Sequence, residues 1–255
     1  MCGRYVITSA PEAIRALFRY PEQPNFPPRF NVAPSQPIPI VRLADDKRQF
    51  ALVRWGLLPS WVKDPKTFAL LINARGESVI DKPAFRAAMK RRRCLIPADG
   101  FYEWQAGGSR KQPYFIRLKS GQPMAFAGLW ECWTGPNGEE LETAAIVTTN
   151  ANRALGHIHD RMPVILAPDA FDLWLNCGEV DARTAEALIQ PAPDDLLEAW
   201  PVSTAVNRTA NDNAALILPL DLSATPAPKP PKPPKAVARP RVKHEASDDG
   251  QGALF

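Results

Sequence analysis

Long apolar runs are missing from this sequence of 255 residues. No stretch approaches the roughly 18 consecutive apolar residues of a membrane-spanning helix, and the first residues lack the basic and apolar segments of a secretory leader. We therefore expect a cytoplasmic protein that has no membrane partner. Hydrophobic residues nevertheless make up 45% of the chain, which is enough for the core of a globular domain.

Cysteine is scarce as well. The four cysteines, Cys2, Cys94, Cys132 and Cys177, show no CxxC spacing. The absence of this spacing argues against a zinc ribbon, and in a reducing compartment the four cysteines would remain thiols. We predict that the protein uses neither a metal ion nor a cofactor.

The motifs of several common enzyme classes are absent. The sequence contains no phosphate-binding glycine loop, no HExxH helix and no GxSxG elbow. Of its three histidines, His244 lies in the C-terminal stretch, so acid–base chemistry near neutral pH would fall to His157 and His159 in GHIHDRMP. A histidine beside Asp160 and Arg161 is also a frequent structural hydrogen-bonding residue.

Positive charge is concentrated near the C-terminus. Of the formal net charge of +4, the residues from Ser223 onward carry +3 (six Lys or Arg against three Asp or Glu), which leaves +1 for the rest. This stretch is rich in Pro, Ala and Lys and has no apolar periodicity, as is typical of linkers. We predict one domain at 1–220 and a disordered tail at 221–255. The densest basic run, Lys90–Arg93, is either a nucleic-acid patch or a solvated helix end.

Predicted strands outnumber predicted helices. Helical patterns occupy 9–19, with Ser9 as N-cap, and also 81–93, 168–176 and 181–190. Apolar and β-branched runs predict strands at 37–43, 50–56, 93–98, 100–105, 113–119, 124–133, 143–149 and 162–167. Because strands follow one another without long helices between them, we predict an α+β fold. Its core would be a curled, largely antiparallel, barrel-like β-sheet with flanking helices.

The chain begins MCGRYV, so removal of Met1 would leave Cys2 as the first residue. Cys2 would then carry an α-amine with a pKa near ~8 next to a thiol with a pKa near ~8.5. This 1,2-aminothiol condenses with an aldehyde, first to an imine and then to a five-membered thiazolidine. Cys2 is otherwise only a small, easily buried residue near a terminus.

Two further patterns place polar side chains beside apolar runs. In LINARGES, Asn73 and Arg75 would share one side of a strand, where an amide and a guanidinium suit a substrate with oxygens and phosphate. The alternative is a solvated arginine at the end of a strand. In DGFYEWQ, Glu103 lies between Tyr102 and Trp104. A carboxylate in apolar surroundings has a raised pKa and can act as a general acid, whereas on an exposed face it meets only solvent.

Six motifs occur in a fixed order along the domain. They are MCGRY at the start, FNVAPSQ (30–36), RWGLLPSW (54–61), INARGES (72–78), PADGFYEW (97–104) and IHDRMPV (158–164). In this order and spacing they resemble the SRAP family, the SOS-response-associated peptidases, now understood as abasic-site processing proteins. The resemblance covers residues 2 to about 218, and the fold it implies is the curled antiparallel sheet predicted above.

The resemblance implies crosslinking of the protein to abasic sites in single-stranded DNA. Carried over by motif, Cys2 is the nucleophile and Asn73 holds the abasic sugar. Glu103 matches the carboxylate that promotes sugar ring-opening and crosslink reversal, and His159 matches the acid–base histidine. Two other activities stay open: a thiol autopeptidase that removes Met1, and a binder of single-stranded DNA that forms no covalent bond.

The resemblance also implies DNA contacts and a location. Arg4, Arg75 and Arg161 would contact phosphates, and Trp61 would stack near the strand. A monomer suffices for this chemistry, and the cytoplasmic protein would associate with the nucleoid during DNA damage.

The last five residues, QGALF, suggest one further partner. Gln251, Leu254 and Phe255 have the Q-x-x-L-F spacing of peptides that dock on bacterial sliding clamps. The tail would let them reach a clamp, and its basic residues would add a nonspecific attraction to DNA.

Overall fold

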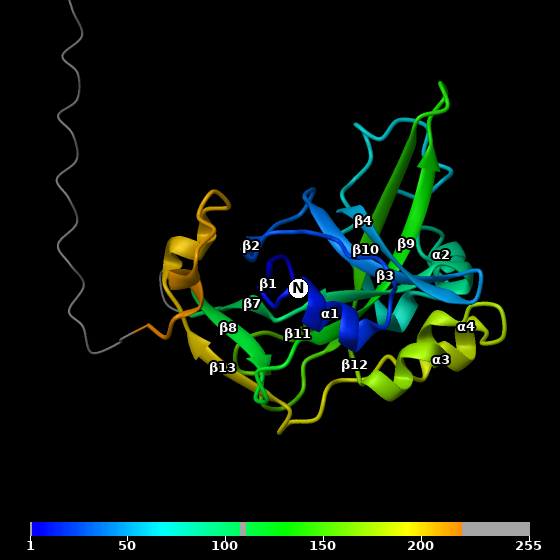
Figure 1. The fold of residues 1–255 in the computed structure, drawn as a ribbon. Coiled ribbons are helices and arrows are strands. Elements are labelled where there is room, and N and C mark those ends of the chain that lie inside the picture. Colours follow the sequence, from blue (N-terminus) through cyan, green and yellow to red (C-terminus); the bar gives the residue numbers. More distant parts are fainter. Residues whose placement is uncertain (1, 108–110, 221–255) are drawn as a thin grey trace, which may run out of the picture. The chain divides into compact units, whose positions relative to one another are not determined.

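Two β-sheets make up most of the fold (Figure 1). The computed structural model describes residues 2–107 and 111–220, which belong to a unit that runs to Leu220. The predicted disordered tail, 221–255, and the clamp-binding residues within it lie outside the described residues.

The first sheet has five strands in the order β13-β8-β7-β1-β2. Their bounds are β1 (Tyr5–Ile7), β2 (Arg29–Val32), β7 (Gly100–Gln105), β8 (Gln112–Leu118) and β13 (Leu197–Pro201). All four pairings are antiparallel. Strand β1 lies between β7 and β2, with Tyr5 opposite Phe101 on one side and Val32 on the other. This pairing holds the N-terminal residues beside β7.

The second sheet curls into a barrel. Its strands pair in the order β10-β4-β3-β6-β9, and β9 pairs again with β10, which closes a ring of five. Their bounds are β3 (Pro37–Ala44), β4 (Lys47–Trp55), β6 (Arg93–Ala98), β9 (Met124–Thr134) and β10 (Glu140–Asn150). Three short strands join at the margins: β5 (Asn73–Arg75), β11 (Arg161–Pro163) and β12 (Ile165–Leu166). The predicted α+β class with a barrel-like, largely antiparallel sheet is confirmed.

The helices are short. The α-helices are α1 (Pro11–Phe18), α2 (Arg86–Arg91), α3 (Phe171–Leu175) and α4 (Ala182–Glu186). Single 3-10 turns form η1 (Gly76–Ser78), η2 (Pro168–Ala170), η3 (Thr204–Asn207) and η4 (Ala214–Ile217). The prediction that Ser9 caps α1 was wrong, because Ala10 is the N-cap. The Ser9 hydroxyl and its main-chain N–H instead donate to the Asp99 carboxylate, a partner that comes from the β6–β7 turn.

The second predicted helix begins later than expected. Helix α2 starts at Arg86 and not at Asp81, and it ends at Arg91, so that Arg93 of the predicted helix begins β6. The Arg93 side chain is buried and donates to the main-chain carbonyls of Met89, Trp174, Asn176 and Val180. A buried guanidinium needs such partners. Arg93 therefore ties α2 to the segment that follows α3 and does not belong to a surface patch.

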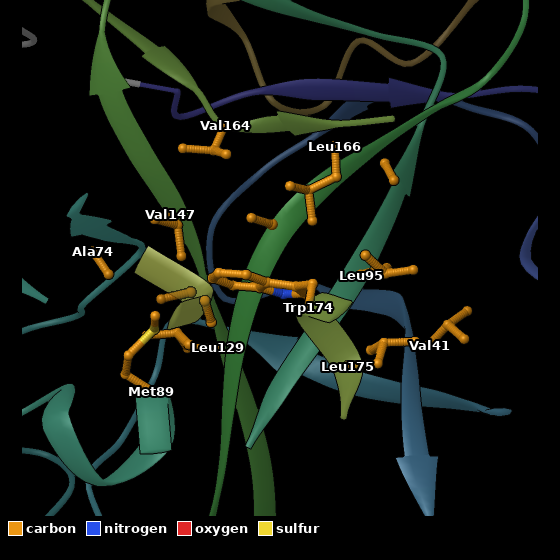
Figure 2. Close-up of a cluster of buried hydrophobic side chains, with 14 of the residues drawn as sticks. Val41, Ala74, Met89, Leu95, Leu129, Val147, Val164, Leu166, Trp174 and Leu175 are labelled. Atoms are coloured by element: carbon orange, nitrogen blue, oxygen red, sulfur yellow. The ribbon is translucent and has the colours of Figure 1, made fainter. Parts of the chain in front are cut away.

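Trp174 lies at the centre of one apolar cluster (Figure 2). Its ring packs among residues of the barrel strands, such as Leu95, Leu129 and Val147, and its Nε1–H donates to the Cys94 carbonyl at 2.9 Å. Replacing such a buried aromatic by alanine costs about 3–5 kcal/mol of folding free energy. A second cluster joins the two sheets and includes Cys2, so the site described next rests on core packing.

Candidate active site

Cys2 is fully buried at the entrance to β1. Its main-chain carbonyl accepts a 2.9 Å hydrogen bond from Asn73 Nδ2, and its Sγ lies 3.9 Å from the Arg4 carbonyl oxygen. Burial raises the thiol pKa far above its usual range, and the negative charge of Glu103 raises it further. The Cys2 sulfur is therefore a neutral thiol in this environment, and it needs a base before it can act as a nucleophile.

Asn73 begins β5, whose three residues pair in parallel with Ile146, Val147 and Thr148 of β10. The pairing directs the amide toward the N-terminus of the chain, where Nδ2 holds the Cys2 carbonyl. The other end of the amide, Oδ1, is buried and has no hydrogen-bond partner among the described residues. A buried acceptor without a partner is uncommon, and here it is available to a ligand hydroxyl beside Cys2.

Glu103 lies on β7, in the sheet that also contains β1. Side chains two apart on a strand share a face, so Glu103 points to the side of Phe101, which packs in the same cluster as Cys2. Only 3% of its side chain is exposed, and this burial raises the pKa of the carboxyl group to about 7. Glu103 can thus either donate or accept a proton near neutral pH.

His159 precedes β11 and brings an imidazole to the same place. Its Nε2 lies 3.7 Å from Glu103 Oε2, and its Nδ1 accepts a 2.9 Å hydrogen bond from the main-chain N–H of Arg161. Burial lowers the pKa of His159, while the carboxylate of Asp160, 2.9 Å from Nδ1, opposes that shift. An imidazole that accepts at Nδ1 carries its proton on Nε2 when neutral, on the side of Glu103.

The structure therefore brings together the four residues predicted to carry the chemistry. Glu103 belongs to the first sheet and Cys2 lies just before its strand β1, whereas Asn73 begins β5 of the second sheet and His159 lies in the loop before β11. His157, the other candidate histidine, packs its ring edge-on against Tyr114.

The arginines predicted to contact phosphates differ in their surroundings. The Arg4 guanidinium donates to Asn31 Oδ1 at 2.9 Å and to the Val206 carbonyl at 2.8 Å. The Arg161 guanidinium donates from Nη2 to Glu77 Oε2 at 2.9 Å. Arg75, by contrast, is exposed at the end of β5.

Trp61 is also exposed, with 58% of its surface accessible, and it stands edge-on to Phe68 at 5.6 Å between ring centroids. An exposed indole held by a second ring is suited to stacking on a base.

Sequence reasoning missed the role of Asn31, which is fully buried. Its Nδ2 donates to the carbonyls of Val206, Arg208 and Asn211, and its Oδ1 accepts from Arg4. Asn31 thus ties the N-terminal residues to the loop after β13. The FNVAPSQ motif contained this residue, but nothing in the motif showed that the amide faces Arg4.

Within residues 2–107 and 111–220, no group of three or more His, Cys, Asp or Glu side chains is arranged to hold a metal ion. In the same residues, no helix is long and apolar enough to cross a membrane.

Comparison with known protein families places the chain. A family model described as "SOS response associated peptidase (SRAP)" matches residues 1–209. The chain belongs to the SRAP family. Two curated relatives illustrate the range of similar proteins. "Abasic site processing protein YoqW" of Bacillus subtilis is 41% identical over 221 residues, which cover 85% of this SRAP chain and 99% of the relative. "Abasic site processing protein HMCES" of Xenopus tropicalis is 34% identical over 267 residues, which cover 86% and 79%.

Solved structures share the fold of this SRAP chain. A protein from Bacteroides thetaiotaomicron superimposes with a TM-score of 0.76 at 25% identity, covering 86% of this chain and all of that one. A phage-related protein from Bordetella bronchiseptica gives a TM-score of 0.64 at 32% identity, covering 79% and 94%. The arrangement of sheets described above is therefore shared with proteins of solved structure.

Proposed function

We propose that this SRAP protein processes abasic sites in single-stranded DNA. It does so by forming a covalent crosslink through Cys2 after Met1 has been removed. Curated relatives that match over most of the chain are named abasic site processing proteins. The observation that carries the proposal is the buried cysteine beside a carboxyl group whose pKa is about 7.

The reaction begins with the sugar. An abasic deoxyribose is mostly a closed hemiacetal, so the C1′ hydroxyl must lose a proton and the ring oxygen must gain one before the aldehyde appears. Glu103 and His159, with 3.7 Å between Oε2 and Nε2, form a pair that can move both protons. Asn73 Oδ1, buried beside the Cys2 carbonyl, accepts a hydrogen bond from a sugar hydroxyl.

The nucleophiles of Cys2 then act in turn. The neutral α-amine attacks C1′ and water leaves, which gives an imine. The thiol adds across the C=N bond: sulfur bonds to C1′, and the thiol proton ends on nitrogen. Because burial holds the sulfur as a thiol, Glu103 accepts that proton as it passes. The closed thiazolidine removes the imine, whose neighbouring C–H bond would otherwise be acidic enough for β-elimination and strand cleavage.

The DNA strand is held by groups around this centre. Exposed Arg75 contacts a phosphate and exposed Trp61 stacks on a base. Arg4, whose guanidinium binds the Val206 carbonyl, contributes positive charge, whereas the Glu77 carboxylate balances the charge of Arg161.

Removal of Met1 is a condition of this mechanism. The same thiol, with Glu103 and His159, would carry out an autocatalytic cleavage of the Met1–Cys2 peptide bond, and the family description includes the word peptidase. A methionine aminopeptidase would serve equally, because it acts before small residues. A Glu103→Gln protein that keeps Met1, while the wild type loses it in the same host, would identify self-cleavage.

A denaturing gel tests the proposed function. Wild-type protein should form a heat-stable adduct with a single-stranded oligonucleotide that carries one abasic site, and none with the intact oligonucleotide. Cys2→Ser should form no stable adduct, because a hydroxyl gives a much weaker oxazolidine. Cys177→Ser, which changes a half-buried cysteine, is the matched control and should react normally. A normal adduct from Cys2→Ser would refute the mechanism, and retention only on native gels would favour a non-covalent binder.

A further inference from the structure

The Arg161 guanidinium is enclosed by oxygen acceptors. Its two terminal nitrogens bind the two carboxylate oxygens of Glu77, with Nη2 to Oε2 at 2.9 Å. Nη1 also donates to Asn150 Oδ1 at 2.8 Å, and Nη2 to the Thr148 carbonyl at 2.9 Å. The Arg161 side chain is only 11% exposed. These bonds fix Arg161 at the start of β11, opposite Asn150 on β10.

Glu77 reaches this position from η1, four residues after Asn73. A two-point arginine–carboxylate contact is stronger and more directional than a single ion pair. Accordingly, the hydrogen bonds from Arg161 hold the pKa of Glu77 below its usual range. Half of the Glu77 side chain remains exposed, so its removal should leave the fold intact.

The main chain of Arg161 connects this contact to the active site. Its N–H donates to His159 Nδ1 at 2.9 Å, so any displacement of Arg161 changes the hydrogen bond that selects the imidazole tautomer. With Nδ1 as acceptor, the proton of the neutral ring is on Nε2, which faces Glu103 Oε2 at 3.7 Å. With the proton on Nδ1 instead, two N–H groups would oppose each other and Nε2 would have no proton to share with Glu103.

We propose that Glu77 is a positioning residue for His159. By binding the Arg161 guanidinium at two points, it holds the Arg161 main-chain N–H against His159 Nδ1. This inference rests on the proposed function for its effect on rate, but its structural content concerns the free protein alone. No step of the chemistry requires Glu77 itself to touch the substrate.

Other charged groups also face His159, and they influence which imidazole nitrogen carries the proton. Glu103 lies on the Nε2 side, Asp160 lies 2.9 Å from Nδ1, and Lys111 lowers the imidazole pKa through space. The Asp160 side chain is 86% exposed, so solvent screens its pull on a proton at Nδ1. Without the Arg161 N–H in place, the attraction of Asp160 for a proton on Nδ1 favours the tautomer that carries the proton on Nδ1.

The test compares Glu77→Gln with a control that breaks another ion pair. Glu198 binds Arg117 Nε at 2.7 Å and belongs to β13, so Glu198→Gln removes a comparable surface contact. In the free protein, ¹⁵N chemical shifts of the imidazole nitrogens report the tautomer. We expect wild type and Glu198→Gln to carry the proton on Nε2, and Glu77→Gln to show a mixture of tautomers.

Kinetics on the abasic oligonucleotide provide the second readout. Glu77→Gln should slow adduct formation about 10-fold, the usual effect of losing a residue that orients a catalytic side chain. It should also shift the pH profile of adduct formation. Combined with His159→Gln, it should add no further loss, because both changes act on one imidazole. An unchanged tautomer in Glu77→Gln, or a further 10-fold loss in the double variant, would overturn the inference. A wild type that forms no adduct would overturn the proposed function instead, while leaving the tautomer measurement valid.

Discussion

Glu103 Oε2 and His159 Nε2 face each other at 3.7 Å, one from β7 and the other from the loop before β11. Burial raises the pKa of the carboxyl group to about 7 and lowers that of the imidazole. The carboxyl group therefore releases its proton near neutral pH, and the imidazole releases its proton more readily than that of a free histidine. Such a pair suits a reaction that must give and take protons at one sugar.

The burial of Glu103 should lower the stability of the folded protein in alkaline solution. An ordinary glutamate has a pKa of 4.5, whereas that of Glu103 is about 7, so the folded state binds the proton more tightly. Stability is then highest below pH 4.5 and falls as pH rises through 7. Glu103→Gln removes this cost and should be about 3 kcal/mol more stable than wild type at pH 8. Denaturant unfolding of both proteins at pH 8 and pH 4 measures this difference in stability. An equal gain at pH 4 would contradict the raised pKa of Glu103.

Asn73 should matter more for rate than for stability. Asn73→Ala removes the hydrogen bond to the Cys2 carbonyl, which costs about 1 kcal/mol of folding free energy. Because the same change frees the nucleophile to move and deletes the acceptor for the sugar, we expect adduct formation to slow about 100-fold. Single-turnover gels measure the rate, and Asn137→Ala, at an exposed turn, is the control. A rate loss no greater than that of the control would contradict the role of Asn73.

Arg75 should contribute to DNA affinity through charge. Arg75→Ala should weaken binding of a single strand and reduce the slope of log affinity against log salt by about 0.7, the value for one phosphate contact on a single strand. Lys119→Ala, at an exposed turn after β8, should leave the slope unchanged. Fluorescence anisotropy on intact oligonucleotide separates this effect from chemistry. Equal slopes for Arg75→Ala and wild type would show that Arg75 touches no phosphate.

The C-terminal motif gives an independent prediction. We propose that Gln251, Leu254 and Phe255 dock on a bacterial sliding clamp, although they lie outside the described residues. Deleting Gln251–Phe255 should abolish clamp binding and leave crosslinking unchanged, since the site uses residues of the sheets. Calorimetric titration with purified clamp checks the first expectation, and unchanged clamp affinity after the deletion would end the proposal.

The sequence predicted the strands better than it predicted which residues form hydrogen bonds with each other. The apolar runs of β6 and β9 were predicted because their patterns are long, whereas β1, β2 and β13 were not, because three to five residues carry little periodicity. Ser9 had the signature of a helix cap, but Asp99 from a distant turn bound it instead. A tertiary contact thus overrode a local rule.

The candidate site shows the same division. The motifs predicted Cys2, Asn73, Glu103 and His159 as the site residues, through the family resemblance and the chemistry of the residue types. The contacts between them were not predictable, because Asn73 lies 71 residues from Cys2 along the chain and His159 lies 56 residues from Glu103. The two-point contact of Glu77 with Arg161 was likewise not predictable. Both residues lie in the motifs of the sequence, but only the structure shows that they bind each other.

The mass of the intact protein tests the central claim most directly. Mature protein isolated from cells should lack Met1. After incubation with an abasic single-stranded oligonucleotide, its mass should rise by that of the oligonucleotide less one water, and proteolysis should locate the added mass on Cys2. Protein that retains Met1, or that keeps its original mass at saturating abasic DNA, would contradict the account.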